Sequence, residues 1–244
     1  GIKREAGESF MEKIIFHKET KTFHLYNEEI SYIMCVLENG HMGQLYYGKR
    51  IHDKPDFSYL VEKCGRPMTS YIFEGDRSFS LEHIRQEYPV YGTTDYRHPA
   101  IEIMQENGSN ISEFKYVGYE ILKGKPSLKG LPATYTESEE EAETLKIILK
   151  DNLTGAKLTL LYTIFSKGSA IARSAHICNE GEKVLHLQTM MSLNLDLPDK
   201  DYVWMQLSGA WSRERYVKNR ILEQGITAID SMRGNSSHEH NPFM

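Results

Sequence analysis

The sequence predicts an all-β protein with little helix, built as a sandwich or barrel of antiparallel strands. Apolar residues recur with a period of two over long stretches, and turn signals such as Asn-Gly recur at short intervals between them. Side chains alternate between the two faces of a strand, so a period of two indicates a strand with one buried face. Stretches with the 3.6-residue period of a helix are nearly absent, and this combination is typical of a sandwich or barrel.

Two Asn-Gly dipeptides, Asn39-Gly40 and Asn107-Gly108, each lie between two apolar segments. Asn-Gly is a strong hairpin signal, because a type I′ turn needs a positive φ at both of its central residues. Two hairpins are therefore predicted: Ser31–Leu37 with Gln44–Tyr47, and Ile101–Gln105 with Phe114–Leu122.

The later part of the chain contains further strand candidates. Lys157–Phe165 is rich in Leu, Thr, Tyr and Ile, which favour strands. Leu185–Leu197 alternates so regularly that we expect one long half-buried strand, with its odd-numbered residues in the core. Two segments are ambiguous: Glu137–Lys150 has a helix-forming composition but a strand-like end, and Trp211–Leu222 fits a short helix or an irregular edge.

The composition is that of an ordinary globular protein. Of 244 residues, 40% are hydrophobic and 26% are charged, so the chain can bury a sizeable core. The net charge of −5 argues against a nucleic-acid partner, because the phosphate backbone requires a basic surface. Apolar runs are far shorter than the roughly 20 residues that a membrane span needs, so no membrane partner is predicted. Without a secretory signal, we expect a cytoplasmic protein with one domain at residues 11–244, preceded by a vector remnant or loose extension at residues 1–10.

No cofactor or metal site is predicted. A P-loop, a Gly-rich dinucleotide turn and a nucleophile elbow are missing from the sequence. The most metal-like cluster, His238-Glu239-His240, supplies two histidines, whereas zinc needs at least three protein ligands. The three cysteines, Cys35, Cys64 and Cys178, are an odd number without C-x-x-C spacing, and we expect small buried thiols in a reducing compartment.

A series of segments, in a fixed order, resembles the N-terminal domain of glycoside hydrolase family 36 α-galactosidases. The segments are Gly75–Leu81, Gln86–Ala100, Lys123–Pro126, Gly130–Tyr135, Glu141–Leu145, Gly209–Arg215 and Ser231–Phe243. Each is weak alone, but together they are specific, and the resemblance runs from about Ile14 to the last residue.

The resemblance implies a large antiparallel β-supersandwich of the galactose-mutarotase-like type, followed in the family by a catalytic (β/α)8 barrel and a small C-terminal domain. Family members cleave terminal α-1,6-linked galactose from melibiose and raffinose-type sugars with retention, using the Asp of a Lys-Trp-Asp motif in the barrel. Here the two tryptophans, Trp204 and Trp211, are followed by Met205 and Ser212. The resemblance therefore implies a fragment that lacks catalytic residues and is inactive alone. It also implies a parent enzyme that is a homo-oligomer, a tetramer, and acts on α-galactoside oligosaccharides.

In tetrameric family members, loops of the N-terminal domain reach a neighbouring subunit's active site. The resemblance places the corresponding loop at about Lys49–Met68, where Asp53, Asp56 and Glu62 are candidate substrate-binding residues. Sugar hydroxyls favour carboxylate acceptors, because a charge-assisted hydrogen bond is stronger than a neutral one. Glu62 is the first candidate, since the basic neighbour Lys63 would orient it, although relatives often carry an Asp-Arg pair at this place.

Two other functions stay open at this point. One is a stand-alone carbohydrate-binding module or lectin. The other is an aldose-1-epimerase-like enzyme, which would need a histidine and a carboxylate converging in a cleft for proton transfer. The shared fold alone does not decide between functions.

Overall fold

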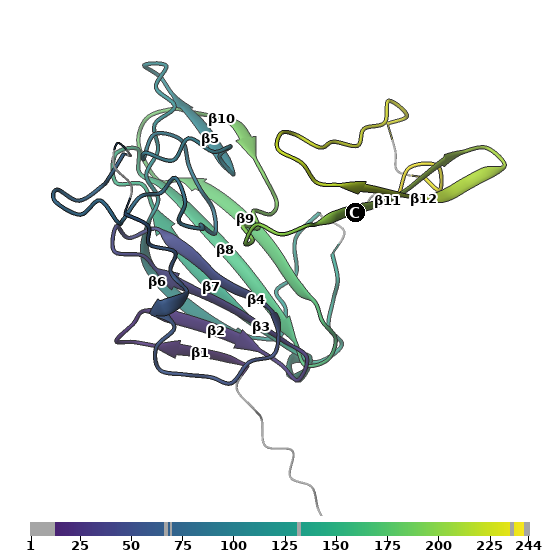
Figure 1. Cartoon of the computed structure of the whole chain (residues 1–244), viewed down its shortest axis with the longest axis horizontal. Helices are drawn as coiled ribbons and strands as arrows, with labels where there is room; N and C mark the ends of the chain where they lie inside the picture. The colour runs from purple at the N-terminus through teal and green to yellow at the C-terminus, as the bar shows by residue number, and fades with distance from the viewer. Residues whose placement is uncertain (1–12, 66–67, 69, 131–132, 235–236, 242–244) are drawn as a thin grey trace, which may run out of the picture. The chain divides into compact units, whose positions relative to one another are not determined.

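The computed structural model describes residues 13–65, 68, 70–130, 133–234 and 237–241. These residues form twelve β-strands and two short 3₁₀ turns, η1 (Ser58–Leu60) and η2 (Glu139–Glu141), with no α-helix among them. The strands pair in antiparallel fashion throughout (Figure 1). The predicted all-β fold with little helix is confirmed, whereas residues 1–10, expected to be a vector remnant or extension, lie outside the described residues.

Two four-stranded sheets form the frame. The first sheet has the order β1 (Ile14–His17), β2 (Thr22–Tyr26), β3 (Ile30–Val36), β4 (Met42–Lys49). The second has the order β6 (Lys115–Lys123), β7 (Ala142–Lys150), β8 (Ala156–Phe165), β9 (Ile171–Asn179). In both sheets neighbours in space are neighbours in sequence, which is the simplest way to connect antiparallel strands.

The two four-stranded sheets share one apolar core. Its fully buried members come from both sheets and include Phe23, Leu25 and Met34 of the first and Leu145, Leu158 and Tyr162 of the second. Each side chain of this size contributes roughly 1.5–3 kcal/mol when it is removed from water. The sandwich is therefore held by the inward-facing residues of both sheets.

The outer face of the first sheet is buried as well. Residues of the segment 51–84 cover it, and they form a second apolar cluster with β3 and β4: Ile33, Cys35, Leu37, Leu45, Phe57, Phe79, Leu81 and Ile84. A strand with two buried faces has no need of a polar face, so its sequence reads as a continuous apolar run. This explains the run from Ile30 to Val36, whose first six residues are buried.

Four strands remain, in two separate pairs. β5 (Ile101–Gln105) pairs with β10 (Leu185–Met190), and β11 (Val203–Ala210) pairs with β12 (Arg213–Ile221). The chain divides into two compact units, 1–197 and 198–244. The first unit holds both four-stranded sheets and the β5–β10 pair, and the second is built on the β11–β12 hairpin.

The first predicted hairpin is confirmed, but its turn is of another type. β3 and β4 pair around Asn39-Gly40, where Gly40 has a φ of +88° and Asn39 does not have a positive φ. The Gly40 N–H donates to Leu37 O, and the Leu37 N–H donates to His41 O. The connection is thus a longer loop with a single left-handed residue rather than a two-residue type I′ turn.

The two ambiguous segments both contain strands. Within 137–150 the chain makes the short turn η2 and then the nine-residue strand β7. Within 211–222 it forms β12, paired along β11 with a register shift between Ser208 and Ala210. Tertiary pairing overrides the helix propensity of the Glu- and Lys-rich stretches.

The second predicted hairpin is wrong. A turn does exist at Asn107-Gly108, where Gly108 has a φ of +82° and its N–H donates to Gln105 O. The strands on either side, however, belong to different sheets, because β5 pairs with β10 and β6 pairs with β7. The turn signal was local and carried no information about which strand β5 would find as its partner.

The single strand predicted over 185–197 is also wrong in length and in its buried face. β10 ends at Met190 and has a register shift between Leu187 and Thr189. On the odd-numbered face Leu187 is 50% exposed and Leu193 is 48% exposed. Beyond β10 the even-numbered polar residues Asn194 and Asp196 make hydrogen bonds to Gln86 and Arg97, within the first unit.

Replacing Leu193 with Ala should therefore change the free energy of unfolding by no more than about 0.5 kcal/mol, the usual range for a surface substitution. The matched change Leu160→Ala, at a side chain that is 2% exposed in the core, should cost about 2–5 kcal/mol. Urea titrations of both variants measure this difference. Equal losses at the two positions would return Leu193 to the core.

Candidate functional site

The loop that follows β4 crosses the outer face of the first sheet and is fastened there through Asp53. The Asp53 Oδ1 atom lies 2.9 Å from His17 Nε2 and 2.7 Å from His24 Nδ1. His17 ends β1 and His24 lies in the middle of β2, so a single carboxylate oxygen joins the loop to two neighbouring strands. His24 is fully buried, whereas the Asp53 side chain is 30% exposed. We call these three side chains the Asp53 clasp.

A carboxylate can only accept, so both imidazoles donate to Asp53, and this fixes the tautomer of His24. Its Nε2 atom then accepts from the Ser31 hydroxyl at 2.9 Å, and Ser31 Oγ in turn accepts the Ile51 N–H at 3.1 Å. Both ring nitrogens of the buried His24 therefore have partners of the right kind. A buried polar group that is satisfied in this way has a fixed geometry.

The pKa values of the clasp agree with a neutral His24 and an ionised Asp53. Burial lowers the pKa of His24 below its ordinary value of 6.5, although the hydrogen bond to Asp53 acts in the opposite direction. Burial alone would raise the pKa of Asp53, but the hydrogen bonds from His17 and His24 outweigh it and hold the pKa below 3.8. Both shifts favour the protonation states that the hydrogen bonds require.

Ser31, His24 and Asp53 are linked in the order found in serine hydrolases, but they do not form a nucleophilic site. In a hydrolase the hydroxyl must meet the substrate. Ser31 is fully buried, and its oxygen accepts a backbone N–H. The arrangement therefore holds structure in place and performs no acyl transfer.

The other two candidate carboxylates have different surroundings. The Asp56 carboxylate accepts the Ser58 N–H at 2.7 Å at the start of η1, and this bond lowers its pKa below 3.8. Glu62 is exposed, and it has no hydrogen bond or ion pair with the described residues around it. Lys63, which we expected to orient Glu62, instead pairs with Glu38 at 2.6 Å. Of the three candidates, Glu62 is thus the one whose carboxylate is left for a ligand.

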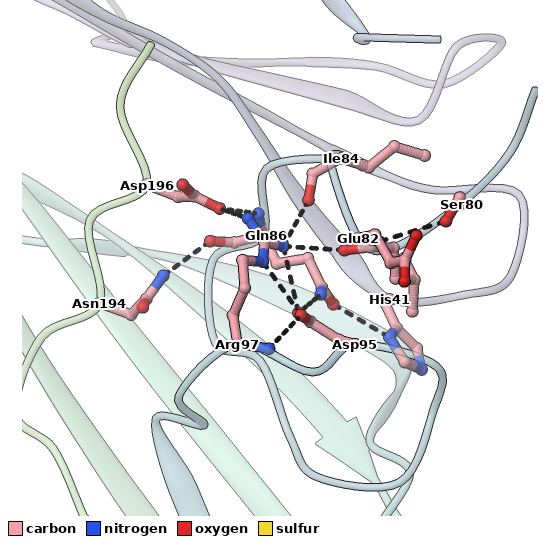
Figure 2. Close-up of polar contacts among 10 residues, drawn as sticks. His41, Ser80, Glu82, Ile84, Gln86, Asp95, Arg97, Asn194 and Asp196 are labelled. Atoms are coloured by element: carbon pink, nitrogen blue, oxygen red, sulfur yellow. Dashed lines mark hydrogen bonds and ion pairs between the residues drawn. The ribbon is translucent and has the colours of Figure 1, made fainter. Parts of the chain in front are cut away.

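A second polar cluster gathers around Arg97, on the long segment between β4 and β5 (Figure 2). Its guanidinium lies 3.0 Å from Asp95 Oδ1 and 2.8 Å from Asp196 Oδ2. It also donates to two backbone carbonyls, those of Leu81 and Ile84, at 3.0 Å and 2.8 Å. Arg97 thereby connects the segment before β5 to the segment after β10, and its positive charge is paired with two carboxylates.

Gln86 extends this cluster (Figure 2). Its side-chain amide donates to Asp95 Oδ2 at 2.6 Å, while its Oε1 atom lies 3.2 Å from His41 Nδ1. Its backbone carbonyl accepts from Asn194 Nδ2 at 2.8 Å. Gln86 thus connects Arg97's partner Asp95, the β4 end of the first sheet at His41 and the segment after β10.

Next to Gln86, a fully buried carboxylate links the two sheets. Glu87 accepts from the hydroxyls of Tyr32 on β3 and Tyr162 on β8, each at 2.7 Å, and pairs with Arg173 on β9 at 3.1 Å. Burial and the Glu87 charge raise the pKa of both tyrosines well above 10. Arg173 also donates to the Asn194 carbonyl at 2.6 Å, so this cluster and that of Arg97 share Asn194.

Comparison with known proteins shows what kind of domain carries these features. The sequence model of the glycosyl hydrolase family 36 N-terminal domain matches residues 40–244. The chain belongs to this family. Its resemblance to the N-terminal domain of family 36 α-galactosidases is thereby confirmed.

Several similar proteins carry the matching region in a much longer chain. The α-galactosidase AgaA of Geobacillus stearothermophilus is 42% identical over 231 residues, which are 95% of this chain and 32% of the relative. The solved α-galactosidase of Lactobacillus brevis superposes with a TM-score of 0.88 at 38% identity, over 94% of this chain and 31% of that one. Variants of AgaA solved in complex with raffinose and with stachyose match with TM-scores of 0.85 and 0.84. The chain spans about a third of the length of these relatives.

The family 36 domain uses several polar residues that sequence reasoning did not single out: His17, His24, Ser31, Asp95, Arg97 and Arg173. Asp95 and Arg97 lie in one of the segments that carry the family resemblance, but the sequence assigned them no role. The signal that was available for His24 is its position, since it lies between the apolar residues Phe23 and Leu25 in the strand Thr22–Tyr26. A polar residue at such a place needs a buried partner.

The remaining candidates for metal binding or redox chemistry lie apart. In the described ranges, no three His, Cys, Asp or Glu side chains are grouped so that they could hold a metal ion. Cys35 is buried and its pKa is raised to about 12, first by burial, whereas Cys64 is exposed, contrary to the expectation of three buried thiols. His238 and Glu239 belong to a turn, in which Glu239 pairs with Arg233 at 2.7 Å. The described part of the family 36 domain also has no helix long and apolar enough to span a membrane.

The clasp should make the stability of the domain depend on acid. The folded pKa of His24 lies below that of the unfolded chain, so the unfolded state takes up the proton first as the pH falls below about 6.5. The charged or titratable groups around His24 are Asp53, His17 and Arg50. The free energy that His24 contributes should be largest at pH 7 and should fall towards pH 5, by no more than about 1.4 kcal/mol per pH unit.

Urea unfolding of the wild type and of His24→Gln at several pH values measures this contribution. The difference in unfolding free energy between the two proteins should narrow from pH 7 to pH 5. A difference that stays constant would show that His24 is not held neutral in the folded state.

Proposed function

We propose that this chain, at residues 11–244, is the non-catalytic N-terminal domain of a retaining α-galactosidase that hydrolyses terminal α-1,6-linked galactose from melibiose and raffinose-type sugars. The observation that carries the proposal is the similarity to the α-galactosidase AgaA, in which 95% of this chain matches 32% of the length of the relative at 42% identity. The complexes of AgaA variants with raffinose and stachyose support α-galactoside oligosaccharides as the substrates of the parent enzyme.

The domain alone lacks the means for the reaction. Retaining hydrolysis requires a carboxylate nucleophile and a carboxylic acid about 5 Å apart across the glycosidic bond. Neither tryptophan of the chain is followed by Asp, so the nucleophile motif of the family is absent. The carboxylates of the buried clusters are already bound by arginine, histidine or tyrosine side chains, and no cofactor enters the proposal.

The domain's own role is to support a homo-oligomeric, cytoplasmic parent enzyme and to help close its galactose pocket. On the loop that follows β4, Glu62 is exposed and its carboxylate has no partner among the described residues, while the base of the loop is fastened to the first sheet through Asp53. Such a carboxylate suits a sugar hydroxyl, because a charge-assisted hydrogen bond is about twice as strong as a neutral one. One loop supplies only one wall of a concave site, so the isolated domain is not expected to hold galactose.

The first test of this function uses the purified 244-residue chain and p-nitrophenyl α-galactoside. No turnover above the blank is expected, because the chain has neither a nucleophile nor an acid/base residue for the double displacement. Activity that survives repurification and increases in proportion to the protein would refute the proposal that the domain is non-catalytic.

The second test concerns the loop and uses the full-length enzyme that contains this domain. Glu62→Ala should lower kcat/KM by a factor that corresponds to about 1.5–3 kcal/mol of lost transition-state stabilisation, the range for a hydrogen bond to a charged group. Glu182→Ala, an exposed carboxylate on the loop after β9, is the matched control and should leave kcat/KM unchanged. If Glu62→Ala also stays within about twofold of the wild type, the loop is not part of the pocket.

A further inference from the structure

We propose that Asp53 is a positioning residue that fixes the loop 51–62 and acts on the sugar only through Glu62. This inference rests on the proposed function of that loop. The sequence had offered Asp53 as a second ligand for the sugar, and the structure shows a carboxylate already engaged by two imidazoles. The following observations favour positioning over direct binding.

The direction of the Asp53 side chain is the first observation. Its two imidazole partners come from β1 and β2, so the bonded oxygen faces the sheet beneath the loop. Asp53, Asp56 and Glu62 are all exposed residues, but of the three only Asp53 is hydrogen-bonded to side chains of the sheet. A ligand that took Asp53 would have to draw it away from two charge-assisted hydrogen bonds, one of them to a fully buried ring.

The second observation is that the clasp holds the loop at several successive points. Ile51 is bonded to Ser31, which is bonded to the same His24 ring that holds Asp53. The fully buried Phe57 packs edge-on against that ring, with 5.5 Å between the centroids. Positions 51, 53 and 57 therefore depend on one imidazole, and the loop base behaves as a unit.

The third observation is that a hollow lies behind the loop beyond Phe57. Behind residues 58–63 there is a hollow of about 430 Å³, lined among the described residues by Cys35, Leu45, Val61 and Phe79. Leu60 and Val61 pack against the second apolar cluster beside this hollow, and the Arg85 side chain donates to the Leu60 carbonyl at 3.3 Å. The position of Glu62 thus depends on these contacts and on the clasp at the base of the loop.

Hydrogen exchange of the 244-residue chain tests the positioning role without reference to activity. The backbone N–H groups of Ile51, Leu60 and Val61 are bonded within the loop region and report on its order. Asp53→Ala should speed exchange over 51–62 by at least about tenfold, while the core strands β7 and β8 keep their protection. Asp53→Asn should speed it by less than about threefold, because the amide oxygen still accepts both imidazole N–H groups.

Asp76→Ala is the matched control for this experiment. Asp76 bonds to Ser78 in another surface loop, so its loss should leave exchange over 51–62 at the wild-type rate. Unchanged exchange in Asp53→Ala would overturn the inference. The inference would also be overturned if β7 and β8 lost protection in both Asp53→Ala and Asp53→Asn, because Asp53 would then stabilise the core rather than the loop.

A double-mutant cycle in the full-length enzyme tests whether Asp53 acts through Glu62. Asp53→Ala should lower kcat/KM by at least about fivefold in the wild-type background and by less than about twofold when Glu62 is already Ala. The Asp53→Asn variant should keep most of the wild-type activity. If the Asp53 carboxylate bound the sugar directly through its charge, the Asn variant would lose activity. Equal losses in the two backgrounds would make Asp53 a ligand in its own right and would overturn the inference.

The two arms separate this inference from the proposed function. If exchange over 51–62 rises in Asp53→Ala but Glu62→Ala leaves kcat/KM unchanged, the pocket-closing role fails, and with it the route from Asp53 to the sugar. If exchange does not rise while Glu62→Ala is impaired, the loop serves the pocket and Asp53 does not position it.

Discussion

The buried carboxylate of Glu87 is the constraint on which the arrangement of the two sheets depends. A fully buried charge is tolerated only when it is paired and hydrogen-bonded. Glu87 obtains its partners from both sheets, Tyr32 of the first and Tyr162 and Arg173 of the second. Each partner lies where the strand registers bring it, so a shift of either sheet would leave the carboxylate unpaired. Apolar packing alone would tolerate such a shift more readily, since it has no direction.

The same polar centre also sets the course of the chain on either side of it. Arg173 continues from Glu87 to the carbonyl of Asn194, and the Asn194 side chain returns to the Gln86 carbonyl. Arg97 then fixes Asp196 by a second route. The segment after β10 is therefore held by its polar residues, which explains why its leucines face outward: the even-numbered positions are taken by hydrogen bonds, and the alternation of the extended chain places Leu193 and Leu195 on the other side.

The sequence predicted the fold class, most strand positions and the first hairpin, because these depend on local periodicity and turn chemistry. It failed where a distant partner decides. Asn107-Gly108 marks a real turn, yet β5 pairs with β10, some 80 residues away. The leucines of 185–197 alternate as in a half-buried strand, yet Leu187, Leu193 and Leu195 are exposed. For the candidate site, the resemblance indicated the loop and its three carboxylates, but His17 and His24 could not be assigned to Asp53, because no sequence signal joins positions 17, 24 and 53.

The three loop carboxylates illustrate how partners decide a role that composition leaves open. In the sequence Asp53, Asp56 and Glu62 are equivalent acids on one loop. In the structure Asp53 accepts hydrogen bonds from two imidazoles, and Asp56 accepts the Ser58 N–H. Among the described residues, Glu62 has no side-chain partner and keeps its acceptor capacity for an outside group. This division of roles suits ligand binding. Residues that are bonded within the protein hold the loop in place, and the carboxylate that they position keeps its oxygens for the ligand. Asp53 makes the base of the loop rigid, and Glu62 presents the carboxylate. A substitution at Asp53 would therefore change the position of Glu62 without removing its charge.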